Sequence, residues 1–447
     1  MNGVAAPRAD DVRFNRGSAV LLCAIGVVAM LAFARFVDLR ALNIPFHDDI
    51  LDVLDFILRF RQAEGWREQA GVWFAQYNDH RTTFPRLIYL LSLRLEGEID
   101  FHTLSLLANS ALPLLVLLYV CWAPRELRVP VFAVAALLLC QPRAFDFVAW
   151  PMSALSFYFV CVHAFAALLL LEQPRPARFA LALLFGCAAT FSLSSGQFVW
   201  PVGAALLAGE TWRGRRESLP WLVAWLVLGA LAVMLFHAGF DNPNALSKLA
   251  GFAWRTPLHH AQYFLALLGS ALAFGSVNVA MIAGAGALLV LASLSTGIAR
   301  PGRHSLCFFA WFLVLGTLAV ALGRAPYSAV DYALSPRYSV ASLNLFAALL
   351  FLQAQHNTLL RGIWRMPVAV VAAAFCLLCY NFYTPLLHGY LQARIARFNQ
   401  GDFPVYGYPL PSTNAIVATA IAEGIYHPPS RPLRLSFVAG GASPQAH

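Results

Sequence analysis

The most constraining feature of this sequence is a series of apolar runs, each about as long as a bilayer is thick. A helix needs roughly 20 apolar residues to cross the hydrocarbon core, and lipid offers no water to an open backbone. The chain has 447 residues, of which 60% are hydrophobic and 12% are charged, whereas a soluble domain carries about 25% charge. We therefore predict an all-α, polytopic integral membrane protein folded as a helical bundle.

Eleven of these runs are predicted to be transmembrane helices. Two other apolar segments, 85–95 and 258–274, are predicted to be interfacial or re-entrant, because the first is short and the second begins with Leu258, His259 and His260. With these two segments left uncrossed, every arginine-bearing turn between spans falls on the same side, as the positive-inside rule requires. The predicted spans are 18–36, 102–122, 129–147, 152–171, 178–193, 197–209, 219–238, 277–296, 305–323, 339–354 and 367–384.

The same rule predicts an orientation. Residues 1–17 are arginine-containing and are predicted to be cytoplasmic, followed by a membrane domain over 18–384. Loop 37–101 and tail 385–447 then lie on the extracytoplasmic side, and the tail is expected to pack on the outer face as a lid. Because Lys248 is the only lysine among 31 basic residues, the composition favours a GC-rich bacterial genome, and the predicted location is the bacterial inner membrane.

The first outer loop concentrates acidic residues, and from Asp48 its pattern becomes helical. An apolar stripe and a polar stripe on opposite faces predict an amphipathic helix lying flat on the membrane surface. The apolar stripe contains Ile50, Leu54, Ile57 and Leu58, and the polar stripe contains Asp48, Asp52, Asp55 and Arg59.

Asp48 and Asp49 begin this helix and allow two interpretations. As helix caps they would contribute about 1 kcal/mol. One acid is enough to cap, however, and the pair comes directly after the first span, so the alternative is a catalytic base held close to the membrane surface. Asp48 is slightly preferred as the base because it shares the polar stripe with Asp52 and Asp55.

The loop ends in the sequence NDHRTTFPR over residues 78–86. Arg86 falls in the first turn of a predicted helix, where a cation opposes the helix dipole. It should therefore bind an anion, which is Asp79, a lipid headgroup or a substrate phosphate. Arg81 is a second candidate phosphate ligand, and His80 is either a general acid, a ligand or neither. Asp79 is a further catalytic candidate, and it or Asp146 is the alternative base if neither Asp48 nor Asp49 serves.

Two further sites lie at predicted outer ends of spans. Asp146 follows one span, and Arg337 with Tyr338 precedes another. An arginine in this position can simply extend its side chain to the interface. Arginines are less expected on the outer side, however, and a guanidinium flanked by tyrosines suits a lipid-linked phosphate.

Three short motifs together resemble the GT-C class of membrane glycosyltransferases: HDD at 47–49, the NDHR and PR parts of 78–86, and SPRY at 335–338. The resemblance covers the topology from the first span to about residue 384. It implies a polyprenyl-phosphate sugar donor, an extracytoplasmic acceptor hydroxyl and inversion at the sugar carbon. It also implies an acceptor-side carboxylate at Asp48 or Asp49 and a second acid at Asp146. A divalent cation is left open, because the first loop has adjacent acids rather than Asp-x-Asp.

The resulting hypothesis is a glycosyltransferase that moves a sugar from a polyprenyl phosphate to a hydroxyl of a lipid or glycan. A carboxylate base would activate the hydroxyl, and arginine would stabilise the leaving phosphate. The alternatives are a transporter or flippase, or a non-catalytic membrane subunit of cell-surface polysaccharide assembly. A transporter should carry ionisable residues along a midplane path, but His163 and His237 are the main ones within the spans.

Overall fold

The computed structural model describes residues 16–241, 255–296, 304–356 and 366–435. Within these ranges the regular structure is helical, and the only strand-like feature is an isolated bridge between Tyr77 and His80. The all-α prediction is confirmed for this part of the chain. The predicted cytoplasmic segment falls almost entirely on residues 1–15, which lie outside the described ranges, as do residues 436–447 of the tail.

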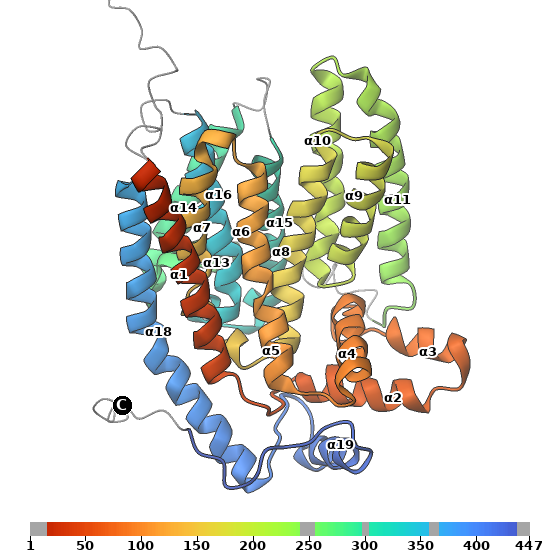
Figure 1. Cartoon of the computed structure of the whole chain (residues 1–447). Helices are drawn as coiled ribbons and strands as arrows, with labels where there is room; N and C mark the ends of the chain where they lie inside the picture. Colours follow the sequence, from red (N-terminus) through yellow and green to blue (C-terminus); the bar gives the residue numbers. More distant parts are fainter. Residues whose placement is uncertain (1–15, 242–254, 297–303, 357–365, 436–447) are drawn as a thin grey trace, which may run out of the picture.

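The long helices stand side by side in one bundle (Figure 1). Several of them begin with proline in the first turn, where its missing N–H removes no hydrogen bond and its fixed φ suits a helix. The bundle helices are α1 (Arg16–Arg40), α5 (Phe101–Asn109), α6 (Ala111–Trp122), α7 (Arg128–Leu139), α8 (Pro151–Leu171), α9 (Pro176–Thr190), α10 (Val199–Trp212), α11 (Leu219–His237), α13 (Pro257–Gly269), α14 (Val277–Ser295), α15 (Ser305–Arg324), α16 (Ser339–His356) and α18 (Pro367–Gln400).

The outward faces of the peripheral helices are apolar. Val28 on α1, Leu231 on α11 and Leu377 on α18 are each more than half exposed. The inner face of α1 packs against α7 so closely that a Cβ on Gly26 would come within 2.5 Å of the Phe132 ring. A bundle that packs tightly inside and exposes large apolar side chains outside has the surface of a protein surrounded by lipid.

Most predicted spans coincide with a helix. Among the described residues, eight helical segments are long and apolar enough to cross a membrane, or nine if α7 and the short helix η3 (Pro142–Val148), bent by 60° at their junction, count as one. The multi-pass character is thereby supported. The two remaining predicted spans correspond to α9 and α10, of 15 and 14 residues, which is short of the roughly 20 residues that a crossing helix needs. The count of eleven stays a prediction.

One end of the bundle carries residues 41–100, and we call it the loop end (the lower end in Figure 1). The helices of the first loop lie at this end, and the tail lies beneath them. The predicted interfacial segment 85–95 is part of α4. The elements at this end are η1 (Ile50–Asp55), α2 (Phe56–Gln62), α3 (Gly65–Trp73), α4 (Thr83–Glu96), η3, η4 (Ser194–Phe198), η9 (Val330–Leu334), η10 (Pro336–Tyr338) and α19 (Leu410–Ala422).

The predicted polar stripe of the first loop is wrong at Asp52, whereas the predicted apolar stripe is buried as expected. Residues 50–55 form a π-helix, which has more residues per turn than the α-helix assumed from the sequence. Asp52 therefore turns inward and is fully buried, as is Asp49 before it. Asp48 and Asp55 remain partly exposed. Two acids of the first loop, Asp49 and Asp52, are therefore buried, whereas Asp48 and Asp55 stay at the surface.

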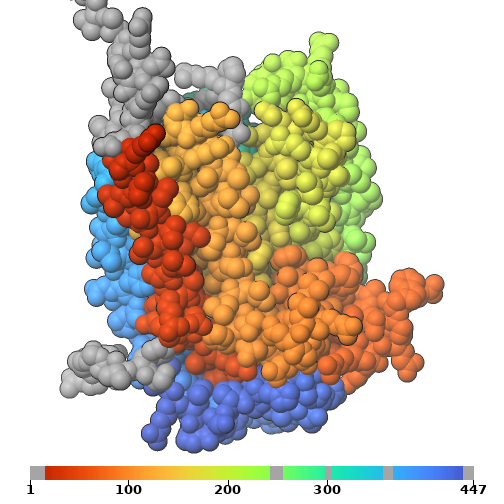
Figure 2. Space-filling view, viewed as in Figure 1, coloured from red at the N-terminus to blue at the C-terminus, as the bar shows by residue number. Residues whose placement is uncertain are grey.

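The tail begins later than the sequence indicated. Pro385 lies inside α18, which continues to Gln400, although the predicted span ended just before this proline. The chain then returns as α19, which packs on η1. Tyr426 donates from its hydroxyl to the carbonyl of Asn43 at 2.9 Å, and Ile99 N–H donates to the carbonyl of Ile425 at 2.7 Å. In the space-filling view the tail covers the underside of the first loop (Figure 2).

Candidate functional site

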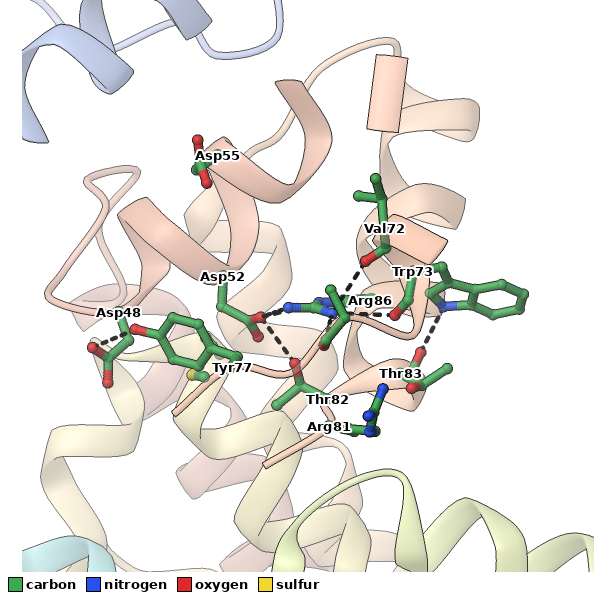
Figure 3. Close-up of polar contacts among 12 residues, drawn as sticks. Asp48, Asp52, Asp55, Val72, Trp73, Tyr77, Arg81, Thr82, Thr83 and Arg86 are labelled. Carbon is green, nitrogen blue, oxygen red and sulfur yellow. Dashed lines mark hydrogen bonds and ion pairs between the residues drawn. The ribbon is translucent and has the colours of Figure 1, made fainter. Parts of the chain in front are cut away.

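The first group of polar residues at the loop end is Asp52, Arg81, Thr82 and Arg86, which we call the loop clamp (Figure 3). The Oδ1 atom of Asp52 accepts from Arg86 Nη2 at 2.7 Å and Nε at 3.0 Å, and from the Thr82 hydroxyl at 2.9 Å. Both members of the Asp52–Arg86 ion pair are buried. This pair joins η1 to the start of α4, across more than thirty residues of sequence.

Arg86 uses its remaining nitrogen on the backbone. Its Nη1 donates to the carbonyls of Val72, Trp73 and Ala75, at 3.3, 3.1 and 2.6 Å. The side chain is only 4% exposed. The sequence was right that this cation needs an anion, but the anion is Asp52. The surroundings of Arg86 do not support the predicted role in binding a substrate phosphate.

Arg81 fastens the clamp to the bundle. Its Nε donates to the carbonyl of Phe236 at 2.6 Å, and its two terminal nitrogens donate to the carbonyls of Ala238 and Phe74. Phe236 and Ala238 are at the C-terminus of α11, where carbonyls lack helical partners and favour a cation. The three nitrogens of Arg81 are thus used within the protein, which does not support a phosphate-binding role for this residue either.

Asp79 and His80 lie at a tight turn between the clamp and η4. The backbone groups of Tyr77 and His80 exchange hydrogen bonds of 2.8 and 2.9 Å, and Asn78 between them has φ of +48°. His80 Nδ1 accepts from Ser194 N–H at 3.4 Å, and burial lowers the pKa of His80 to about 4. A neutral imidazole that already accepts a hydrogen bond is poorly suited as a general acid, and Asp79 is exposed.

The second group brings together residues from four parts of the chain, and we call it the outer cluster. It consists of His47, Asp48, Asp146, Trp150, Arg337 and Arg394. Asp146 in η3 accepts the backbone N–H of Arg337 with Oδ2 at 3.2 Å. Its other oxygen, Oδ1, is buried and accepts no hydrogen bond. Asp146 and Arg337, which the sequence had placed at separate outer ends, therefore meet at one site, and Asp48 adjoins it as the chain neighbour of His47.

Arg337 is half-buried and surrounded by aromatic rings. Its guanidinium carbon lies 5.0 Å from the centroid of Tyr338, 5.4 Å from Trp150 and 5.5 Å from Tyr332. Its Nη2 donates to the Tyr332 hydroxyl. Among the described residues, no carboxylate oxygen lies within ion-pair distance of its guanidinium. This arginine is held by rings and remains open to an anion.

Asp49 is part of the framework rather than of the open face. Its two oxygens accept the N–H groups of Phe46 at 2.9 Å and Met152 at 3.1 Å, and Met152 lies in the first turn of α8. The Asp49 side chain accepts no N–H of η1, the helix that follows it. It accepts one from the first turn of α8 instead, so the capping interpretation holds for α8. Burial raises the pKa of Asp49 to about 8 despite Arg394 nearby. Neither oxygen is open to an acceptor hydroxyl.

Asp48 is arranged differently. Its Oδ1 accepts from the Tyr77 hydroxyl at 2.8 Å (Figure 3), and the side chain is partly exposed. Within the described residues its Oδ2 accepts no hydrogen bond. The contact with Asp48 and burial raise the pKa of Tyr77, so the phenol stays a donor. Asp48 is therefore the carboxylate that combines a fixed position with an open oxygen.

His47, Trp150 and Arg394 were not predicted from the sequence to form a group. His47 has φ of +45°, and its ring lies 3.8 Å from Phe46 and 5.6 Å from Trp150 between centroids. Arg394, in the continuation of α18, donates to the carbonyls of Ala149 and Ile44. Three buried atoms here have no hydrogen-bond partner in the part of the chain that the structure describes: His47 Nδ1, Trp150 Nε1 and Arg394 Nε. Such atoms are rare in folded proteins and mark functional sites when they cluster.

The described residues contain no group of three histidine, cysteine, aspartate or glutamate side chains able to hold a metal ion. Asp48 and Asp49 turn to different partners, so they do not form a bidentate pair. Any divalent cation would have to use fewer side chains together with substrate oxygens.

Comparisons with known proteins give no relative. No protein-family model matches the chain, no curated protein matches it, and no solved structure matches it. The chemistry of the outer cluster therefore has to carry any functional assignment.

Proposed function

We propose that this protein is a membrane glycosyltransferase of GT-C type. It transfers a sugar from a polyprenyl-phosphate donor to a hydroxyl of a lipid or glycan, at the loop end of the bundle, on the extracytoplasmic side of a bacterial inner membrane. The observation that carries the proposal is a ring-held arginine, Arg337, with no carboxylate oxygen within ion-pair distance among the described residues, in a cluster adjoined by Asp48, a carboxylate with an open oxygen next to His47.

Each side chain has a separate task in this reaction. Asp48 accepts the proton of the acceptor hydroxyl as that oxygen attacks the sugar carbon, because such a hydroxyl is otherwise a weak nucleophile. Arg337 stabilises the charge that develops on the leaving phosphate. Asp146 holds the backbone of Arg337 in place, and Tyr77 holds Asp48. These last two are positioning residues.

The position of the cluster suits a lipid-linked donor. Tyr338 follows Arg337 and lines an apolar pocket between α8, α15 and α16, together with Phe157, Leu313 and Val340. A prenyl chain is an apolar ligand of this kind, and its phosphate would lie next to the guanidinium. The transporter alternative gains no comparable support, since no described feature provides a polar path through the bundle.

The test is sugar transfer by purified protein with a radiolabelled polyprenyl-phosphate sugar and a crude acceptor lipid fraction. Asp48→Asn should lower transfer by about 10²–10⁴-fold with little change in thermal stability. Asp55→Asn is the matched control, because Asp55 lies in the same loop at the end of η1, is partly exposed and forms an ion pair with exposed Arg59 at 3.6 Å. Equal rates for both variants and the wild type would refute Asp48 as the base.

A further inference from the structure

A second cleft lies beside the outer cluster, between the start of the first loop and the tail. Its walls come from residues 44–47 and Ile50, from the last turns of α18 and from residues 402–404. His47 and Arg394 line this cleft and also belong to the outer cluster. The cleft therefore opens next to the proposed base rather than at a remote surface.

The charges around this cleft are unbalanced. Arg394 and Arg397 line it, and Asp402 is the only carboxylate among its lining residues. Arg397 and Asp402 are 3.8 Å apart, and the Arg397 side chain is 61% exposed. Arg431 lies 4.5 Å above the ring of Phe398, another lining residue. Two guanidinium groups and one acid thus line the cleft itself, and a third guanidinium lies over one of its rings.

The buried part of the cleft also has unused hydrogen-bonding atoms. Arg394 is 5% exposed, and its Nε has no partner although both terminal nitrogens donate to carbonyls. His47 Nδ1 is likewise buried without a partner. Burying a guanidinium N–H without a hydrogen-bond acceptor costs free energy, and a bound ligand that supplies an acceptor removes this cost. The only acid next to Arg394, Asp49, is engaged with backbone donors.

We propose that this cleft binds an anionic group, a carboxylate or a phosphate, carried by the saccharide acceptor. That the bound sugar is the acceptor of the reaction rests on the proposed function. The binding of an acidic sugar in this cleft does not. Arg394 and Arg397 hold the anion, since arginine matches planar or tetrahedral oxyanions. The rings of Phe46, Phe398 and Phe403, which line the cleft, offer apolar faces to the sugar ring.

The arrangement also explains how two anions could be kept apart. His47 lines the cleft and its ring lies 5.6 Å from that of Trp150, over which the Arg337 guanidinium lies at 5.4 Å, so these two rings connect the cleft to the ring-held arginine. The acceptor anion would lie on the Arg394 side and the donor phosphate on the Arg337 side. Asp48, next to His47 in the chain, is then close to the hydroxyl groups of an acceptor held in the cleft.

The test measures binding to the purified full-length protein, in detergent, by equilibrium dialysis. The probes are radiolabelled glucuronate, glucose 6-phosphate and glucose. We expect binding of at least one anionic sugar and none of glucose in the same concentration range. Preference for glucuronate would identify a carboxylate as the recognised group, and preference for glucose 6-phosphate a phosphate. Failure of both to bind, or equal binding of glucose, overturns the proposal.

Three variants make the test specific. Arg397→Gln should weaken the anionic probe by about tenfold, the loss expected for one charge-assisted contact. Arg59→Gln is the matched control, because this side chain is 55% exposed, pairs with an acid at 3.6 Å and is not part of the cleft. Asp402→Asn should tighten binding several-fold by removing the one repelling charge. A purely structural role of Arg397 predicts no such gain, and unchanged binding in Arg397→Gln refutes the site.

These results separate the two proposals. Anion binding that responds to Arg397 and Asp402, with no sugar transfer by the wild type, would leave the site standing and remove the glycosyltransferase. Sugar transfer that depends on Asp48, without anion binding, would support the glycosyltransferase and refute the anion site.

Discussion

The loop clamp and the outer cluster lie at the same end of the molecule. His47 and Asp48 of the outer cluster come just before η1 in the chain, and Asp52 of the clamp lies within it. The two regions differ in how their polar groups are satisfied. In the clamp, every nitrogen of Arg81 and Arg86 donates within the protein. In the outer cluster, Asp146 Oδ1, Trp150 Nε1 and His47 Nδ1 are buried without partners.

This difference separates stability from function. Arginines whose nitrogens all donate within the protein have none left with which to bind a substrate, although the Oδ2 atom of Asp52 beside them is buried without a partner among the described residues. In the outer cluster the unpartnered atoms come from several side chains, and such groups cost free energy and persist where a ligand completes them. Changes in the clamp should therefore destabilise the fold, and changes in the outer cluster should impair the reaction. The following predictions test that division, beginning with the largest expected effect.

Arg86→Ala should lower the free energy of unfolding by about 3–5 kcal/mol, because it leaves Asp52 as a buried acid without its cation. The measurement is thermal unfolding of the purified protein in detergent. Arg59→Ala is the control, since its exposed pair with Asp55 contributes about 0–1 kcal/mol. An Arg86→Ala protein as stable as the wild type would show that the clamp is not the stabilising region.

The clamp also shows how far the sequence could lead. Arg86 was predicted to need an anion from its place in a helix, and that was correct. Its identity could not be predicted, because the π-helix at Ile50–Asp55 turns Asp52 inward and no residue pattern announced the extra residue per turn. The α-helical register instead placed Asp52 on a wet stripe.

Arg337→Ala should slow sugar transfer by about 10²–10³-fold, the usual loss on removing a donor that stabilises developing charge. Arg337→Lys should restore only part of the rate, because the planar fork and its contacts with three rings are lost. Both variants should unfold at nearly the wild-type temperature. A large loss of stability with little loss of rate would show that Arg337 stabilises the fold rather than taking part in the reaction.

The outer cluster was predicted only in part. Asp48, Asp146 and Arg337 were identified because acids and outer arginines at span ends are unusual. Arg394 was missed because its partners, the carbonyls of Ile44 and Ala149, lie hundreds of residues away in the chain and carry no side-chain signal. The bundle itself was more predictable, since apolar length is a local property. For the short helices α9 and α10, length alone is insufficient to predict whether they cross the membrane.

Asp49 lies between the two regions and should give the protein a distinctive pH dependence. The folded carboxyl keeps its proton up to about pH 8, whereas an unfolded aspartate loses it near pH 4. Between these values unfolding releases a proton, so stability falls as pH rises, by up to about 1.4 kcal/mol per pH unit. Relative to wild type, Asp49→Asn should therefore gain stability from pH 5 to pH 8. A stability difference that is constant over this range would argue against a protonated Asp49.

The smallest predicted effect concerns Tyr77, which links the two regions. Its backbone forms the turn with His80 next to the clamp, and its hydroxyl holds Asp48 at 2.8 Å. Tyr77→Phe keeps the ring and removes one hydrogen bond, which contributes about 0.5–1.5 kcal/mol. If Asp48 is the base, the same loss should appear mainly as a rate reduction of about tenfold or less, because the carboxylate is no longer fixed, while thermal stability changes little. Tyr406→Phe is the control, since Tyr406 is 97% exposed. An unchanged rate would show that Asp48 needs no positioning partner. A loss as large as that of Asp48→Asn would instead mean that the phenol itself takes part in the reaction, and the boundary between the two regions would move to include it.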